Sequence, residues 1–454
     1  MLGIGSSYEL GSAPNASPNQ SGLFYNFADA AELFKLHPPR ITDQPIIAAL
    51  HRARSPSPRG TGDTALVVAK SWRIALLCAA GAVAVSGAAA LFTIGFAGWE
   101  PSILVRMSKI EPMSEIARSA DRDFVFVSSG SHFDGVYFYA IALDPFARND
   151  DVYTRIDLYQ YRYGHPGYGW VSGLFALGDP ARLPWSMLLV ALASMGAGAW
   201  AVSRIADHLG HSPWWGLLVA ANPGLVFSVT VLCSEPLGVA LAAVGLLLWL
   251  RGSFAVAAAV FAGACLVKEL FILVPAGLFL WEAIRSVQHR AVPGIPFRMV
   301  VLAASTVPLA LWYLYLRVHF GVFPALAEPG NLGMPLVGWF ETFGIAVRMS
   351  RGGASQIGTF TITLLTITGA AMLVGVVRAL RIKSPFDVMF LLSAVLFAMV
   401  NWKILLFPKD VIRGLMMVPL LLPAVIAGVD WKPWPDAPAR ASRPMVRREE
   451  YERP

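Results

Sequence analysis

Long stretches of apolar residues without a charged side chain recur along most of the chain and limit what it can fold into. The first, residues 74–99, is long enough to cross the roughly 30 Å hydrocarbon core of a bilayer as a helix. Only 14% of the residues are charged, whereas a soluble protein carries roughly 25%. The stretches are continuous rather than alternating, which argues against an outer-membrane barrel. We therefore predict an all-α membrane protein.

The apolar stretches predict a bundle of about ten transmembrane helices, several of them short. The candidate spans are residues 74–99, 183–203, 212–234, 236–250, 252–267, 270–281, 299–316, 352–377, 388–407 and 414–429. Residues 166–178 are apolar too, but a span there would put the basic C-terminal tail outside, so we expect an interfacial or re-entrant helix. The chain then divides into a disordered basic cytoplasmic tail (1–72), a membrane domain (73–430) and a second basic cytoplasmic tail (431–454).

Lysine and arginine residues concentrate in both tails and in the loops after every second span. Because positive loops face the cytoplasm, this pattern predicts that both ends of the chain lie inside. The first external loop, residues 100–182, and the helix ends that carry Glu235, Lys268, Glu269 and Arg413 then share the outer face. The net charge of +7 suits anionic membrane lipids rather than nucleic acid. The three cysteines lie in apolar segments without metal-ligand spacing, and we predict no metal site.

One run in the predicted external loop, residues 131–145, combines carboxylates with aromatic rings. Asp134 precedes a glycine, which lets the backbone turn tightly and leaves the carboxylate accessible. A carboxylate is the expected base for deprotonating an acceptor hydroxyl, and it can also stabilise positive charge at an anomeric carbon. Tyr137 and Tyr139 follow, and aromatic rings form natural walls for a sugar ring. The spacing alone fits equally a simple helix cap at Asp134.

The run from His132 to residue 142 resembles the first-external-loop motif of the polytopic GT-C glycosyltransferases. It is most similar to the PIG-V-like mannosyltransferases and their bacterial relatives, whose loop reads roughly Trp-Asp-Gly-x-Tyr-Tyr-x-x-Ile-Ala. Further similar segments follow in order at Tyr-Arg-Tyr-Gly-His-Pro (161–166), Asn-Pro-Gly (222–224), Ser-Glu-Pro-Leu (234–237) and Ala-Cys-Leu-Val-Lys-Glu (264–269). The resemblance covers residues 70–280, and Phe133 and Ser234 stand where the family has Trp and Thr.

The resemblance implies a GT-C-like helical fold around a lipid-accessible cavity. It implies an enzyme that moves a sugar, with mannose as the candidate, from a polyprenyl-phosphate carrier to a hydroxyl on a lipid, glycan or protein acceptor. The reaction would invert the anomeric carbon, with Asp134 as the catalytic base and no cofactor besides the lipid-linked donor. We expect the protein in a bacterial inner membrane, with the site facing the periplasm.

The donor phosphate needs cations, because it leaves as an anion whose charge must be stabilised. Arginine offers a bidentate fork to phosphate, and lysine offers a point charge. The candidate substrate-binding residues are His132, Tyr137, Tyr139, Arg162, His165, Glu235, Lys268, Glu269 and Arg413. Structural roles stand beside these: Arg162 and Arg413 as headgroup anchors, and Glu235 with Lys268 as an ion pair between neighbouring turns.

Two other classes of function fit the same composition. A transporter or flippase of lipid-linked sugar precursors would show inverted repeats, discontinuous helices and a site near the bilayer midplane. No internal repeat is evident, and the unusual polar groups fall on one predicted face. A non-catalytic membrane subunit would turn Asp134 away from any cavity.

Overall fold

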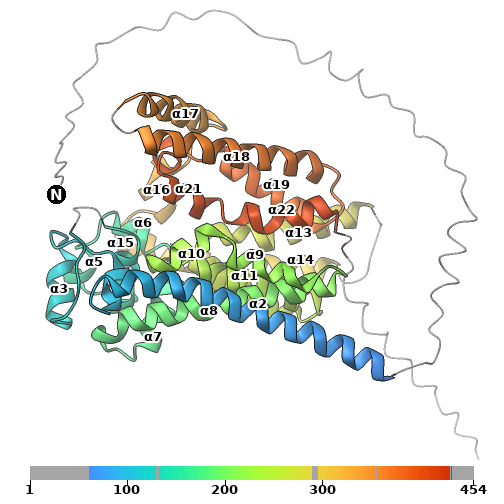
Figure 1. The fold of residues 1–454 in the computed structure, drawn as a ribbon, viewed down its shortest axis with the longest axis horizontal. Coiled ribbons are helices and arrows are strands. Elements are labelled where there is room, and N and C mark those ends of the chain that lie inside the picture. Colours follow the sequence, from blue (N-terminus) through green and yellow to red (C-terminus); the bar gives the residue numbers. More distant parts are fainter. Residues whose placement is uncertain (1–60, 129–131, 289–294, 353–354, 430, 432–454) are drawn as a thin grey trace, which may run out of the picture. The chain divides into compact units, whose positions relative to one another are not determined.

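The regular elements in the described part of the chain are all helices, as predicted (Figure 1). A computed structural model describes residues 61–128, 132–288, 295–352, 355–429 and 431. Helix α2 (Thr61–Gly95) begins before residue 72, because the polar end of the predicted tail continues the apolar helix. The rest of the two predicted tails, residues 1–60 and 432–454, lies outside the described residues.

Five helices in the described part are long and apolar enough to cross a membrane. They are α2, α8 (Leu183–His208), α13 (Leu273–Gln288), the consecutive α14 (Ile295–Ala304) and α15 (Val307–Phe320), and α18 (Ser355–Ala379). A sixth span arises if α21 (Pro408–Gly414) and α22 (Met417–Ala427), which meet at a 48° bend, count as one. Three shorter apolar helices are α11 (Glu235–Leu250), α12 (Phe254–Val267) and α19 (Pro385–Ala398). These features are typical of a multi-pass membrane protein.

The prediction of one continuous span over residues 212–234 is wrong. This segment forms three short pieces, η4 (Pro213–Gly216), α9 (Leu217–Ala220) and α10 (Pro223–Thr230). The side chain of Asn222 accepts hydrogen bonds from the backbone N–H groups of the first turn of α10, which starts a new helix. Proline at the next position lacks the N–H that would continue the helix before it.

The segment between α2 and α8 folds into short helices rather than a span. They are η2 (Pro101–Val105), α3 (Met113–Ala120), α4 (Gly135–Leu143), α5 (Asp150–Tyr153), α6 (Tyr159–Arg162), α7 (Gly167–Phe175) and η3 (Pro180–Arg182). In Figure 1 these helices gather at one end of α2 and α8. Helix α4 is buried along most of its length and packs on η2 and α7. This burial holds the residue before α4, Asp134, at a fixed place.

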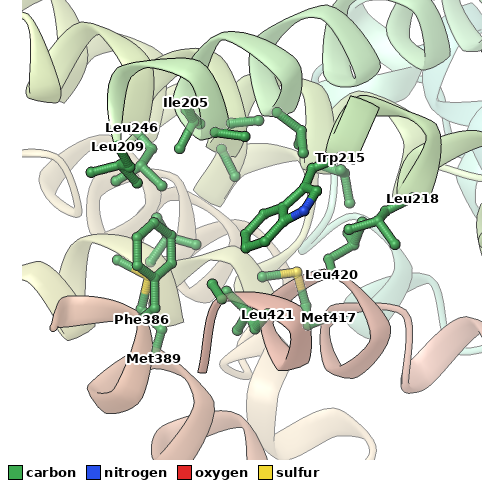
Figure 2. A pocket seen from close by; sticks show the side chains of 17 residues that line it. Ile205, Leu209, Trp215, Leu218, Leu246, Phe386, Met389, Met417, Leu420 and Leu421 are labelled. Atoms are coloured by element: carbon green, nitrogen blue, oxygen red, sulfur yellow. The ribbon is translucent and has the colours of Figure 1, made fainter. Parts of the chain in front are cut away.

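The later helices form two groups that enclose an apolar cavity. α11 packs on α8 and α12, whereas α18, α19 and α22 pack on one another, and α13 contacts both α12 and α19. The side chains that line the cavity come from α8, η4, α9, α11, α13, α19 and α22, and all of them are apolar (Figure 2). Trp215, Leu246, Phe386 and Met417 are among them. The indole nitrogen of Trp215 is the polar side-chain atom in this otherwise hydrocarbon and thioether lining.

Helices α10 and α21 approach each other without an intervening side chain at Gly224. A Cβ atom there would lie 2.1 Å from the backbone oxygen of Ile412 and 3.2 Å from the Cα of Arg413. The side-chain amide of Asn222 also donates a hydrogen bond to the backbone oxygen of Met416, at 2.9 Å. The Asn-Pro-Gly run therefore sets the position of the helix that carries Arg413.

We predict that Gly224→Ala lowers the free energy of unfolding by about 1–3 kcal/mol, because backbone atoms of α21 must move to make room for the methyl group. Thermal unfolding of the purified protein in detergent measures the effect. Gly263→Ala is the matched control, since a Cβ there meets only Leu241 Cδ1, at an ordinary 3.5 Å. Equal melting temperatures for Gly224→Ala and the unchanged protein would contradict the prediction.

Candidate functional site

The carboxylate of Asp134 is paired with two guanidinium groups. Arg413 Nη2 donates a hydrogen bond to Asp134 Oδ2 at 2.5 Å, and Arg162 Nη1 lies 3.5 Å from Oδ1. Asp134 occupies the cap position of α4, but its side chain makes no cap hydrogen bond. Capping of α4 therefore does not explain the position of this carboxylate. It contacts the two arginine side chains instead.

A second carboxylate, Glu235, is completely buried and shares the same arginine. Arg413 donates to Glu235 Oε1 through Nη2 at 2.8 Å and through Nε at 3.2 Å. Lys268 Nζ donates to the same oxygen at 3.0 Å. The predicted ion pair of Glu235 with Lys268 is present, but Arg413 extends it to Asp134. Residues far apart in the sequence thus form one network at the ends of α11, α12 and α21.

The aromatic ring of Phe133, the residue before Asp134, lies next to two cations. The Lys409 ammonium lies 4.4 Å from the centre of the Phe133 ring, and the Arg413 guanidinium carbon lies 5.1 Å from it. Cations are attracted to the face of an aromatic ring. Phe133 therefore helps to hold positive charge next to Asp134.

The network fixes the charge of Asp134. Burial raises the pKa of its carboxyl group, but the positive charges of Arg413 and Arg162 outweigh burial and hold the pKa well below its usual value. The side chain is therefore ionised and can only accept hydrogen bonds. Its basicity depends on whether these two arginines remain bound to it.

Arg162 belongs to a second set of contacts on the other side of Asp134. Its guanidinium lies over the ring of Tyr137, 3.8 Å from the ring centre, and Nη2 donates to the Tyr137 hydroxyl at 3.1 Å. Its Nε donates to Asp157 at 3.2 Å. His132 contacts the Tyr137 hydroxyl through Nε2 and Glu111 through Nδ1, both at 2.5 Å. Glu111 and Asp157 are absent from the predicted site residues, because neither stands in a recognisable motif.

A third set of contacts lies beside Lys268. His165 Nε2 contacts the carboxylate of Glu269, and the ring of Tyr161 lies edge-on to the imidazole with 5.0 Å between ring centres. His165 precedes α7, and Glu269 begins the helical turn η5 (Glu269–Ile272). The structure therefore holds His165 through Glu269.

A hollow connects the three sets. Its lining residues are Asp134, Tyr137, Phe138, Tyr161, Arg162, His165, Ser234 and Lys268. Behind this lining, His132, Glu235, Glu269 and Arg413 contact the lining side chains directly. Tyr139 is the exception among the predicted residues. It is fully buried and packs edge-on against Phe124, so it cannot form the predicted wall of a sugar site.

The hollow combines the parts that bind a phosphate ester. Arg162 and Lys268 line the hollow and Arg413 stands directly behind Asp134, so all three supply positive charge, and the two arginines offer planar forks suited to phosphate oxygens. Asp134 supplies a carboxylate beside them, and Tyr137 and Tyr161 supply aromatic surface. Among the described residues, no group of three or more His, Cys, Asp or Glu side chains is arranged to hold a metal ion.

No protein-family model matches the chain, and no curated protein is significantly similar to it. In the residues that the structure describes, the protein is all-helical, with several helices that are long and apolar enough to cross a membrane.

We predict that Arg413→Met lowers the free energy of unfolding by about 3–5 kcal/mol, because it leaves buried Glu235 with one fewer partner and Asp134 with a weaker counter-charge. Thermal unfolding in detergent gives the measurement. Arg182→Met is the control, since that side chain is 67% exposed and pairs only with neighbouring Asp179; its effect should stay below about 1 kcal/mol. If both variants lost the same free energy of unfolding, the buried network would stabilise the protein no more than the exposed ion pair does.

Proposed function

We propose that the protein is a membrane glycosyltransferase of the GT-C type. It moves a sugar from a polyprenyl-phosphate carrier to an acceptor hydroxyl on the extracytoplasmic face, with inversion and with Asp134 as the base. The observation that carries the proposal is the network in which Asp134 shares Arg413 with buried Glu235 and also pairs with Arg162. The resemblance of residues 132–142 to the family motif supports the same assignment.

The two arginines give the donor phosphate a way to activate the base. A phosphate between sugar and lipid carries a negative charge, so it competes with Asp134 for Arg413 and Arg162. As the guanidinium groups turn to the phosphate, Asp134 loses the charges that depress its pKa and becomes more basic. The base therefore becomes effective when the donor is bound.

The reaction then follows as a single displacement. The acceptor oxygen attacks the anomeric carbon while Asp134 takes the hydroxyl proton, and the bond between that carbon and the phosphate oxygen breaks. Arg413, Arg162 and Lys268 stabilise the charge that develops on the leaving phosphate. Tyr161, which is partly exposed at the hollow, provides a ring against which a sugar can stack, whereas the ring of Tyr137 is covered by Arg162.

The apolar cavity supports a lipid-linked donor. Val239 and Leu246 of the cavity wall follow Glu235 along α11 at helical spacing, and Met417 follows Arg413 one turn later at the start of α22. Along α11 the apolar wall therefore begins about one helical turn, or roughly 6 Å of helix rise, after Glu235. We assign the cavity, whose lining is shown in Figure 2, to the isoprenoid chain of the donor, and we assign its phosphate to Arg413.

A transporter or flippase of lipid-linked sugar precursors is the second candidate. The 48° bend between α21 and α22 favours it, because discontinuous helices line the sites of many transporters. The charged groups, however, stand at helix ends: Glu235 begins α11, and Lys268 follows the last residue of α12. A transferase forms a new glycosidic bond, whereas a flippase moves its lipid unchanged, so analysis of the products separates the two.

We predict that Asp134→Asn reduces sugar transfer by at least about 100-fold while the protein stays folded, because an amide cannot accept the hydroxyl proton. The assay supplies purified protein with polyprenyl-phosphate mannose and other polyprenyl-phosphate sugars, and detects glycosylated products by mass spectrometry. Asp123→Asn is the control, an exposed aspartate in the same segment between α2 and α8. Full transfer by a folded Asp134→Asn protein would rule out this residue as the base.

A further inference from the structure

Glu111, His132 and Tyr137 form a chain of contacts that ends on Arg162, and we name these three residues the Glu111 clamp. The carboxylate of Glu111 lies 2.5 Å from His132 Nδ1, and His132 Nε2 lies 2.5 Å from the Tyr137 hydroxyl. Arg162 then donates to that hydroxyl at 3.1 Å and lies over the Tyr137 ring. Only Tyr137 and Arg162 line the hollow, so Glu111 and His132 stand behind the site.

Counting donors and acceptors determines where the protons lie. An ionised carboxylate only accepts, so His132 Nδ1 carries a proton toward Glu111. Arginine only donates, so the Tyr137 oxygen accepts from Arg162. His132 Nε2 then donates to the same oxygen when the imidazole is charged, or accepts the Tyr137 proton when it is neutral. In the charged state the Tyr137 oxygen accepts hydrogen bonds from both His132 and Arg162.

The surroundings of His132 favour its charged state. Among the described residues, the charged side chains that face it are Glu111 from the segment before α3, Asp157 from the segment between α5 and α6, and, across Tyr137, Arg162 of α6. The Asp157 carboxylate, 3.8 Å from Nε2, raises the pKa of His132, burial lowers it, and Glu111 raises it further, so that the pKa lies above its usual value.

We infer that Glu111 and His132 are positioning residues that hold Tyr137, and through it Arg162, in place for the donor phosphate. The inference rests on the proposed function. When the phosphate draws Arg162 Nη1 away from Asp134, the guanidinium stays anchored at Nε by Asp157 and at Nη2 by Tyr137. Arg162 can therefore exchange one anion for another without losing its position or its rotamer.

The test compares Glu111→Gln, His132→Gln and Tyr137→Phe with the unchanged protein. We expect each to raise the KM for the polyprenyl-phosphate sugar, and to lower kcat/KM, by between about tenfold and 100-fold, because Arg162 is misplaced. The KM for the acceptor should change little. Combining Glu111→Gln with Tyr137→Phe should cost no more than the larger single effect, since both break the same chain. Unchanged donor KM in all three folded variants would overturn the inference.

Glu115→Gln is the matched control for Glu111→Gln. Glu115 lies in the nearby helix α3 and is largely exposed, and it pairs with Arg155 rather than with the clamp. The control should leave donor KM unchanged. A loss of equal size in both variants would mean that charge on this segment, rather than the clamp, supports activity.

The pH dependence follows from the direction of the pKa shift. The charged form of His132 is the form that the clamp stabilises, so its contribution is complete below the ordinary pKa of about 6.5 and is lost as pH rises through the raised pKa. Transfer by the unchanged protein should fall over that range. In Glu111→Gln the fall should begin at lower pH, and in His132→Gln this step should be missing. The same pH step in all three proteins would contradict the inference.

A readout without substrate separates the clamp from the proposed function. NMR of isotope-labelled histidine in the purified protein reports the titration of His132, assigned by its disappearance in His132→Gln. A lowered pKa in Glu111→Gln supports the clamp even if no sugar transfer is found, in which case the proposed function alone fails. An unchanged His132 titration in Glu111→Gln contradicts the clamp whatever the transfer assay shows.

Discussion

The burial of one negative charge, on Glu235, organises this end of the molecule. A carboxylate away from water costs several kcal/mol unless positive groups and hydrogen bonds compensate it. Here the compensation comes from Lys268, next to the end of α12, and from Arg413 in α21. Each partner is drawn to the same oxygen, so three segments distant in sequence must meet there. Arg413 Nη2, which donates to Glu235, also donates a hydrogen bond to Asp134 and so links the two carboxylates.

The sequence allows the general arrangement of the site to be predicted because charge is rare in this chain. Ionisable side chains are excluded from the apolar interior of a bilayer, so those at the ends of apolar stretches gather where water or partners are present. The positions of Lys268 and Arg413 follow from this rule, whereas Asp134 and Arg162 are predicted from the loop segment and its resemblance to the family motif. The structure brings all four together. The apolar stretches likewise predict most of the helices, since their length and composition leave little alternative.

Other features of the site and fold cannot be predicted from the sequence pattern. The contact of Glu111 with His132 depends on how the loop folds, and nothing in the residues around Glu111 marks it. Tyr137 and Tyr139 both belong to the aromatic run that predicts a sugar-binding wall, yet the two side chains lie on different sides of a short helix, and only Tyr137 reaches the hollow. The predicted span over residues 212–234 is apolar enough to cross a bilayer, but Asn222 and the following proline interrupt it.

That interruption has a consequence for how the charged end is assembled. Because α10 starts afresh, its first turn can press Gly224 directly onto the backbone of α21, next to Arg413. A single hydrogen atom in place of a side chain therefore sets the reach of the arginine toward Glu235 and Asp134. The distances between the charged groups at this end of the bundle therefore depend on how closely the backbones of α10 and α21 approach. A bulkier residue at position 224 would change these distances without replacing any charged residue.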